Sequence, residues 1–342
     1  MLARLLTPLR LASAALVVLV AALVFLLTHG SESYLEVPDE AHPLAKLVQV
    51  PGSNAHEDGG GIYYVDVLVK PASLLESLLP TFRPEGSELI NRHDLFGRCS
   101  SISESERYEF ERADMKLSQV TASAVALRAL GYRVPVRLGG VRIVSVSSGS
   151  HAGGVLKAGD VIVSADGKPV RAREELSAIL ARHRVGDRVR IGILRGGERR
   201  TFMIQTTRDK CDPRRPILGV IPTQALKVRL PFRIGFNLSG VGGPSAGLAF
   251  ALELLEKRGR DVDRGYKVAA TGELNLNGSV TRIGGVKQKT IGARLAHVDV
   301  FLVPVDGDNA REAKRYAHGL RIIPVESFQQ ALRALATLPR KT

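Results

Sequence analysis

The sequence contains no tryptophan, three methionines and two cysteines, and aromatic residues make up only 5% of its 342 positions. Hydrophobic residues nevertheless account for 44% of the chain and charged residues for 24%, so ordinary cores can form and wholesale disorder is excluded. At about 150 residues per domain, the length indicates roughly two domains plus extra segments, and a single small module is excluded.

Several functional motifs are absent as well. No GxxxxGK[ST] phosphate-binding loop occurs, which argues against an intrinsic ATP motor. The cysteines form no CxxC pair and stand away from histidine clusters, so we expect them to have no metal-binding or catalytic role. No metal and no organic cofactor is expected for the chain. The net charge of +14 comes from scattered, mostly arginine residues without a dense run or interleaved aromatics, and we therefore expect no specific nucleic-acid binding.

An uncharged apolar stretch runs from Leu11 to Leu27, preceded by Arg4 and Arg10 and followed by carboxylates. It is longer than the ~7 to 15 residues of a signal-peptide core and close to the ~20 of a membrane-spanning helix. We interpret residues 11–28 as a signal anchor of a single-pass cell-membrane protein. The positive-inside rule places residues 1–10 in the cytoplasm and the body outside. A cleaved signal peptide is the alternative, although no clear small-x-small cleavage site follows the stretch.

The two cysteines, Cys99 and Cys211, fit an exported body. An even number of cysteines in an oxidising compartment permits one disulfide. The two residues flank a central β-rich segment, so a disulfide would join the ends of that segment, but the sequence alone leaves the pairing open.

Residues 29–131 form an N-terminal section without a catalytic constellation of its own. The β-branched and aromatic residues of Ile62–Lys70 predict a strand, followed by a short helix. Ser103 and Glu106 form a capping box, which predicts the start of one long helix.

Residues 132–208 change to a pattern of short strands around one amphipathic helix. The phrase VRIVSVSSGSHAGGVLKAGDVIVSADGKPV resembles a PDZ domain of the type attached to bacterial exported proteases. PDZ domains add an extended peptide as a strand beside a sheet edge and hold its carboxylate in a loop. The resemblance implies that the loop is Leu138, Gly139, Gly140 and Val141, which departs from the family's Gly-Leu-Gly-Phe wording. The alternative is that the module only gates or positions another part of the chain.

Residues 209–342 alternate strands and helices and predict an α/β layer structure. The segment GGPSAG places Ser245 at a glycine-rich turn that opens a helix. Glycines such as Gly243 let the backbone bend and bring N–H groups toward a substrate carbonyl, and a helix N-terminus favours an oxyanion. By itself the motif fits either a nucleophile or a helix N-cap.

Two further motifs follow downstream, Thr271-Gly272-Glu273 and the phrase IGGVKQK that ends at Lys289. Together with GPSAG, these motifs resemble the proteolytic domain of Lon-type serine proteases over roughly residues 215–335. The resemblance implies that Ser245 is the nucleophile and that Lys289 is its general base. It also implies that Thr271 bonds the lysine amine, with Gly243 and Pro244 in support.

A lysine with the usual pKa near 10.4 is almost fully protonated at neutral pH, so the pKa of Lys289 must be lowered for it to act as a base. Lys287 points elsewhere on the expected helix. ATP-dependent Lon enzymes commonly carry an acidic residue just before GPSAG, but residues 239–243 contain no carboxylate. Control by such a residue is therefore absent or relocated. Without a motor, the substrates are expected to be unfolded or flexible protein segments.

The order of anchor, PDZ and Lon-like segments resembles membrane-anchored bacterial PDZ-Lon proteases, the YlbL-like family. The resemblance implies an α+β multidomain fold with a transmembrane helix, a PDZ-like module and an α/β Lon proteolytic domain, to which residues 29–131 contribute. It also implies an ATP-independent serine endopeptidase whose body is extracytoplasmic. Expected partners are protein substrates, the membrane through residues 11–28, and a PDZ ligand that is a protein C-terminus or an internal strand. A homo-oligomer is left open.

Two other functions compete with this hypothesis. Gly243-x-Ser245-x-Gly247 matches the nucleophile elbow of α/β-hydrolases, with Asp306 and His318 as partners, but the chain after Ser245 is short for that fold. The second is a catalytically inactive, membrane-tethered PDZ adaptor. The presence of both the serine and the lysine argues against that adaptor.

Overall fold

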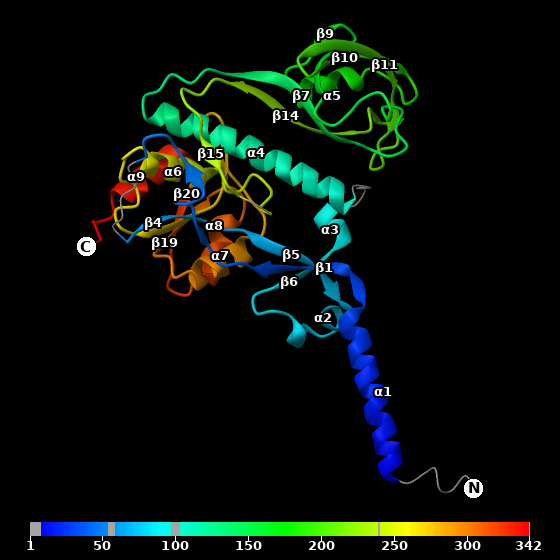
Figure 1. Ribbon diagram of the computed structural model, residues 1–342, viewed down its shortest axis with the longest axis vertical. Helices are drawn as coiled ribbons and strands as arrows, with labels where there is room; N and C mark the ends of the chain where they lie inside the picture. Colours follow the sequence, from blue (N-terminus) through cyan, green and yellow to red (C-terminus); the bar gives the residue numbers. More distant parts are fainter. Residues whose placement is uncertain (1–7, 54–58, 97–102, 239, 342) are drawn as a thin grey trace.

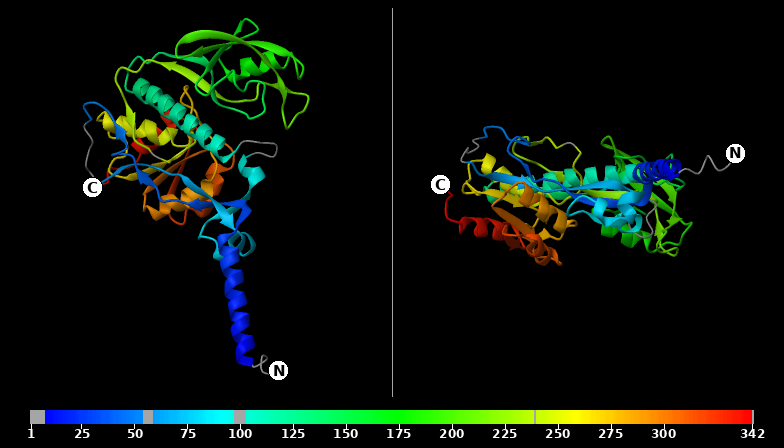
Figure 2. Two further views of the ribbon diagram at one scale, coloured as in Figure 1. Left: turned by 45° about the vertical axis from the view of Figure 1, so that its right-hand side comes forward. Right: turned by 90° about the horizontal axis from the view of Figure 1, so that it is seen from below.

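The computed structural model describes residues 8–53, 59–96, 103–238 and 240–341. In Figure 1 a long N-terminal helix, α1, projects alone from an α/β body, and a β-rich module lies across helix α4 at the other end of the molecule. Figure 2 shows the same order of parts from two other directions. Cys99 lies outside the described residues, so its disulfide with Cys211 stays a prediction; Cys211 itself is exposed.

Helix α1 (Pro8–Thr28) is long and apolar enough to cross a membrane. Its 21 residues span about 30 Å, which equals the thickness of a hydrocarbon core. The window Leu11–Thr28 has a mean hydropathy of 2.8, and none of it is buried against the rest of the protein. A signal sequence near an N-terminus has the same properties.

The body is built on a five-stranded sheet in the order β2-β4-β16-β19-β20. All neighbouring strands are parallel except β2, which runs antiparallel to β4. The five strands are β2 (His42–Pro43), β4 (Gly61–Tyr64), β16 (Lys267–Ala270), β19 (Val300–Pro304) and β20 (Arg321–Val325).

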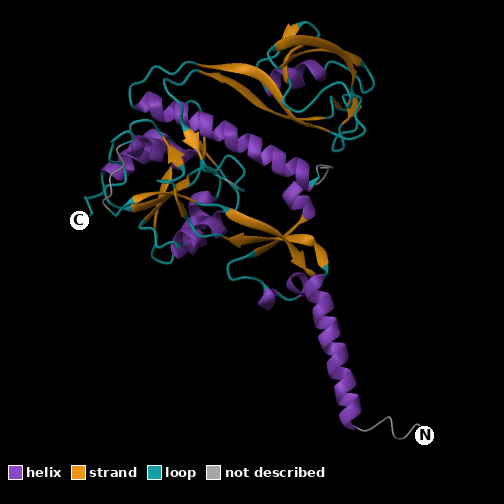
Figure 3. Ribbon diagram, viewed as in Figure 1, coloured by secondary structure: helices purple, strands orange, loops and turns teal. Residues whose placement is uncertain are grey.

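Helices cover both faces of this sheet (Figure 3). Successive strand residues point to opposite faces, so Val268 packs in one core while Ala269 packs in the other. All five residues of β19 are buried, as expected for a central parallel strand covered on two sides. The first core contains α6 (Gly247–Lys257) and α9 (Phe328–Ala336), and the second contains α7 (Val286–Leu295) and α8 (Asn309–Tyr316).

The single strand predicted at Ile62–Lys70 is wrong, because the chain changes sheets in the middle of it. Strand β4 pairs in parallel with β16, whereas β5 (Val67–Ser73) pairs antiparallel with β1 (Gly30–Pro38). Strand β6 (Glu88–Asn91) adds to the other side of β1. Asp66 lies between the two strands, where the chain passes from one sheet to the other.

Both N-terminal helix predictions are confirmed. Helix α2 (Leu74–Leu78) begins after a capping box, and a 3₁₀ turn (Pro80–Phe82) follows it. Helix α4 (Glu104–Ala129) begins at the predicted capping box of Ser103 with Glu106 and packs against α6. Between them lies the short helix α3 (Arg92–Phe96).

The predicted β-rich module has a core of its own, which includes Ile143, Ile162 and Ile191. Its sheet follows the order β11-β10-β8-β7-β14, with β9 beside β8. Strand β14 was not predicted and completes the edge of the sheet next to β7. The elements are β7 (Val136–Val146), β8 (Val161–Ala165), β9 (Lys168–Pro169), α5 (Arg173–Leu180), β10 (Arg188–Arg195), β11 (Glu198–Gln205) and β14 (Val220–Val228).

Short two-stranded pairs complete the chain. The segment Phe232–Leu238 forms only the two-residue strand β15, because only these two residues pair with β3. A turn at Asn277-Gly278, a pair of residues typical of hairpin turns, joins β17 to β18. These strands are β3 (Val48–Gln49), β12 (Thr207–Arg208), β13 (Pro216–Ile217), β15 (Gly235–Phe236), β17 (Glu273–Leu274) and β18 (Val280–Thr281).

Candidate active site

Ser245 lies in the turn that precedes α6, two residues before the helix begins at Gly247. The cap residue of α6 is Ala246, and no side chain caps the helix, so the N-cap interpretation of Ser245 is wrong. Glycines shape this turn for different reasons. A Cβ at Gly242 would lie 2.7 Å from Cβ of Glu111, and Gly243 has a φ of +82°, in the left-handed region.

Helix α7 brings Lys289 to the serine. Nζ of Lys289 lies 3.0 Å from Oγ of Ser245, within hydrogen-bond distance. The lysine is 5% exposed, so its aliphatic stem is held in the core while its amine faces the serine. Lys287, two residues earlier, forms an ion pair with Glu88 instead, at 3.5 Å. The second lysine of the phrase, Lys289, therefore lies beside the serine, and the first, Lys287, does not.

Burial sets the protonation of this lysine. Desolvation lowers the pKa of Lys289 to about 8, and the negative charges of Asp66 and Glu36 oppose part of that shift. Burial in turn raises the pKa values of Glu36 and Asp66. At pH 8 about half of the Lys289 side chains are neutral and can accept a proton.

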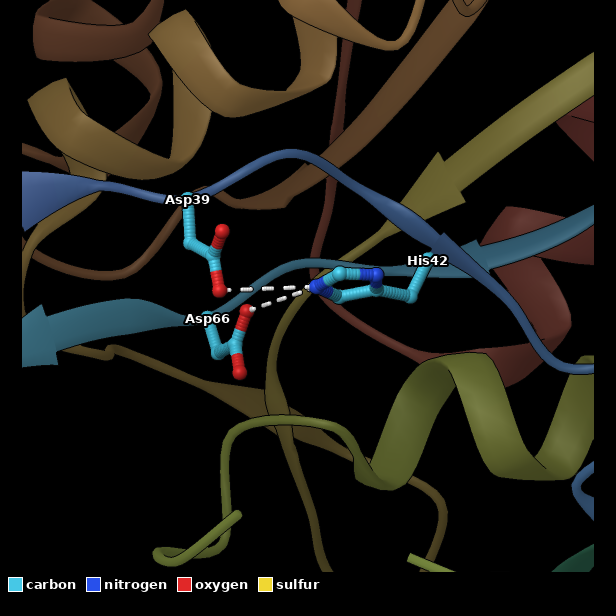
Figure 4. Close-up of side chains that lie close together, drawn as sticks. All are labelled: Asp39, His42 and Asp66. Atoms are coloured by element: carbon cyan, nitrogen blue, oxygen red, sulfur yellow. Dashed lines mark hydrogen bonds and ion pairs between the residues drawn. The ribbon is translucent and has the colours of Figure 1, made fainter. Parts of the chain in front are cut away.

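Asp66 belongs to a polar cluster with Asp39 and His42 (Figure 4). His42 Nε2 lies 3.5 Å from Oδ2 of Asp39 and 3.9 Å from Oδ1 of Asp66, between the two carboxylates. The imidazole also lies beside the ring of Tyr64, with 5.3 Å between the ring centres. The only sequence signal of this cluster is Asp66, a carboxylate within the apolar run YYVDV, and our sequence reasoning missed it.

Ser245 and Lys289 open into a cavity of about 470 Å³. Strand β5 forms one wall, the residues before GPSAG form another, and the N-terminal turns of α4 form a third. The lining residues are Tyr34, Glu36, Asp66, Val67, Leu68, Val69, Pro71, Glu104, Arg107, Tyr108, Glu111, Gly240, Val241, Gly242, Gly243, Ser245, Gly284, Gly285 and Lys289. The serine therefore shares its cavity with β5, which is an edge strand of its sheet.

Thr271 is fully buried beside the site, but with a different partner from the one expected. Its Oγ1 donates to the backbone oxygen of Ser245 at 3.2 Å, and the described residues include no hydrogen bond between Thr271 and Lys289. The threonine thus holds the main chain of the nucleophile rather than the amine of the base.

Helix α4 holds the turn before the serine at two points. The N–H of Gly243 donates to the backbone oxygen of Glu111 at 2.9 Å, and Oγ of Ser118 donates to the backbone oxygen of Pro244 at 3.0 Å. Because the Gly243 N–H is bonded to the helix, it does not point to a substrate carbonyl in this structure. The sequence reasoning missed the contribution of α4, since no motif links the two segments.

The predicted PDZ loop is not open. Residues Leu138, Gly139, Gly140 and Val141 lie within β7, and β14 pairs antiparallel with them, opposing Ala225 to Gly140 and Leu226 to Leu138. The hydrolase partners are not brought to the serine either. Asp306 accepts the N–H of Arg282 at 3.3 Å, and His318 lines a different cavity, so the structure does not assemble that triad.

Two groups of described residues have donor atoms close enough to share a metal ion, with all donors within 4.8 Å of one another. The first is the Asp39, His42 and Asp66 cluster, whose side chains already neighbour one another. The second is Glu256, Asp261 and Asp263, and Glu256 Oε1 there accepts the N–H groups of Val262 and Asp263. In the first group Oδ1 of Asp66 is buried without a hydrogen-bond partner, whereas contacts within the protein occupy the second group.

Two family models match the chain in the regions described above. The PDZ domain matches residues 128–206, and the Lon protease (S16) C-terminal proteolytic domain matches residues 240–337, which include both Ser245 and Lys289. The chain combines a PDZ domain with a Lon-type proteolytic domain. Its fold is the expected α+β one, with an N-terminal apolar helix that fits a membrane anchor.

Curated relatives of the Lon-type domain are Lon proteases. The chain is 39% identical over 103 residues to the Lon protease of Clostridium beijerinckii, covering 29% of this chain and 13% of that protein. It is 31% identical over 126 residues to Lon protease 2 of Bacillus subtilis, covering 36% of this chain and 22% of that protein. The chain therefore spans only a small part of the length of these relatives.

A solved structure resembles the PDZ domain. It is the PDZ domain of an SdrC-like protein from Listeria monocytogenes, 30% identical, covering 25% of this chain and 87% of that chain, with a TM-score of 0.23.

Proposed function

We propose that the protein is an ATP-independent serine endopeptidase that uses a Ser245–Lys289 dyad to cleave unfolded or flexible protein segments. The observation that carries the proposal is the 3.0 Å approach of a buried lysine amine to the serine hydroxyl. A lysine must be neutral to accept a proton. Burial lowers the pKa of this lysine to about 8, so a substantial fraction of the amine is neutral at mildly alkaline pH.

The reaction follows from this geometry. Neutral Lys289 accepts the hydroxyl proton while Oγ of Ser245 attacks the peptide carbonyl. Backbone N–H groups of the turn stabilise the oxyanion once the Gly243 N–H has left the backbone oxygen of Glu111. The resulting ammonium of Lys289 returns the proton to the leaving amine. Water then hydrolyses the serine ester with the lysine again acting as base. Strand β5 along the cavity favours an extended substrate segment.

Trapping the acyl-enzyme tests this proposal. The full chain in detergent, without nucleotide, is mixed with casein, quenched in acid, digested and analysed by mass spectrometry. We expect casein fragments and an acylated peptide that contains Ser245, and neither with Ser245→Ala. Cleavage that persists in Ser245→Ala would reject the dyad. A folded wild-type protein that cleaves nothing would favour the adaptor function instead.

We further propose that α1 anchors the protein in the cell membrane with the body on the extracytoplasmic side, as the arginines before the apolar stretch favour. Three large side chains just beyond α1 support this placement. Leu78, Leu79 and Phe82 are 66%, 45% and 54% exposed. The N–H of Leu74, at the start of α2, donates to the oxygen of His29 directly after α1, which ties these residues to the end of the apolar helix.

The neighbouring charges suit a membrane interface. Glu76 pairs with Lys70 at 2.8 Å, and the guanidinium of Arg83 donates to the backbone oxygens of Glu76 and Ser77. Both views of Figure 2 and Figure 1 place α2 at the end of α1. Strand β1 begins at Gly30, just after α1, and the cavity residue Glu36 lies six residues further along it, a distance of about 20 Å. This anchoring would therefore hold the active site close to the bilayer surface.

The absence of tryptophan makes the anchoring easy to test. In vesicles of phosphatidylcholine and phosphatidylglycerol, Phe82→Trp provides a single tryptophan that brominated lipids should quench near the headgroups. Leu19→Trp, within α1, should be quenched by bromines near the bilayer centre. Met203→Trp, exposed in the PDZ domain, should not be quenched. An unquenched Leu19→Trp would contradict the anchor, and an unquenched Phe82→Trp alone would contradict the interfacial contact.

A further inference from the structure

The PDZ domain has a strand of its own chain at the edge where a PDZ ligand would add. Strand β14 runs antiparallel to β7 from Val220 opposite Val146 to Val228 opposite Val136. Peptides join PDZ domains as an added strand at a sheet edge. Here that edge is already paired along its whole length, including the expected carboxylate loop, and α5 contacts both strands.

One side chain fixes β14 to the loop. The amide nitrogen of Gln224 donates to the backbone oxygens of Gly140 at 2.9 Å and Arg171 at 2.8 Å. It also lies 3.0 Å from the backbone oxygen of Ala225. These acceptors belong to β7 and to the segment that leads into α5, so Gln224 closes the space between the loop and the helix.

The opposite face of β14 contacts the protease domain. The neighbouring residue Thr223 points to the other side of the strand, and its Oγ1 donates to Oδ1 of Asp114 on α4 at 3.1 Å. Asp114 stands three residues after Glu111 and four before Ser118, so the three lie along one side of the helix. Glu111 and Ser118 are the residues that hold Gly243 and Pro244.

We propose that β14 is the resident ligand of the PDZ domain and that, through α4, it restrains the protease. The dyad is assembled, but the Gly243 N–H is bonded to Glu111 and is withheld from the oxyanion. An external peptide gains the PDZ edge only by displacing β14, which frees α4 and lets Gly243 turn its N–H toward the substrate. Loss of one oxyanion donor lowers kcat by about 10²- to 10³-fold. Release of the Gly243 N–H can therefore raise kcat substantially.

Gln224→Ala tests whether β14 occupies the PDZ edge and whether it restrains the protease. Gln205→Ala is the matched control. Gln205 also donates a side-chain amide to a glycine oxygen in the PDZ domain, that of Gly186 at 3.0 Å, but it does not lie on β14. A fluorescent peptide that copies residues 218–228 should bind full-length Gln224→Ala at least tenfold more tightly than wild type or Gln205→Ala. Equal affinity, or no binding to any of them, would overturn the occupancy of the edge.

The restraint is measured on the same variants. Gln224→Ala should raise kcat for casein cleavage by about tenfold and speed the hydrogen exchange of the Gly243 amide, while Gln205→Ala should change neither. An unchanged exchange rate, or a lower kcat, would overturn the restraint. The activity measurement rests on the proposed protease function, whereas peptide binding and hydrogen exchange need no catalysis, so a failure of that function would be recognised separately.

Discussion

Replacing Lys289 by arginine is expected to lower kcat/KM for casein cleavage by about 10²- to 10⁴-fold, the usual contribution of a general base. Arginine keeps the positive charge and the long stem, but its guanidinium does not lose its proton in proteins and cannot accept one from Ser245. In the wild-type protein, burial lowers the pKa of the Lys289 amine to about 8. The loss would therefore report basicity rather than charge.

The pH dependence separates this role from a structural one. Since the neutral amine is the active form, wild-type kcat/KM should rise tenfold per pH unit below about pH 8 and level off above it. The residual activity of Lys289→Arg should lack this inflection. Lys287→Arg is the control, because Lys287 pairs with Glu88 and does not reach the serine. Full activity in Lys289→Arg, or the same inflection in that variant, would reject Lys289 as the base.

Adding a single methyl group at Gly292 is expected to lower both the stability and the activity of the protein. A Cβ there would lie 1.8 Å from the backbone oxygen of Asp39, and the oxygen of Gly292 already accepts the N–H of Ala41 at 3.2 Å. Helix α7 must therefore move away from the segment after β1. Lys289 stands one turn earlier on the same helix, so its amine would move away from Ser245.

Gly292→Ala should lower the free energy of unfolding by about 1 to 3 kcal/mol, as overpacked cores do, and lower kcat/KM by at least about tenfold. Urea unfolding and casein cleavage measure the two effects. Gly30→Ala is the matched control, because nothing lies within 4 Å of a Cβ at that position. Wild-type stability and activity in Gly292→Ala would show that the close approach of α7 to Asp39 is not needed.

The local elements were predictable because their signals are short in range. The capping box at Ser103 marks the start of α4, and hydrophobic periodicity marks the helices of the Lon-type domain. Strand β20 and the Asn277-Gly278 turn likewise follow from nearby residues. The break at Asp66 was not predictable in this way, because distant strands pair with the residues on either side of it: β16 pairs with β4 before Asp66, and β1 pairs with β5 after it.

The dyad was predictable only through the spacing of recognised motifs. Nothing local to Lys289 distinguishes it from a solvated surface lysine, and its burial arises from the packing of α7 against β1. The same holds for Thr271, whose partner became the backbone of Ser245 once both were placed in the core. Cys99 lies outside the described residues, so the disulfide prediction remains as the sequence left it.

The sequence by itself determined the apolar N-terminal helix, the PDZ and Lon-type domains, and the serine and lysine that the proposed mechanism uses, because composition, periodicity and motif spacing are properties of neighbouring residues. Only the tertiary structure decided that Asp66 and Glu36 line the same cavity as the lysine, that α4 bonds the Gly243 N–H, and that β14 pairs with the PDZ edge. Each of these contacts joins segments that lie far apart in the chain. Their formation depends on how sheets and helices pack, which no short stretch of residues specifies.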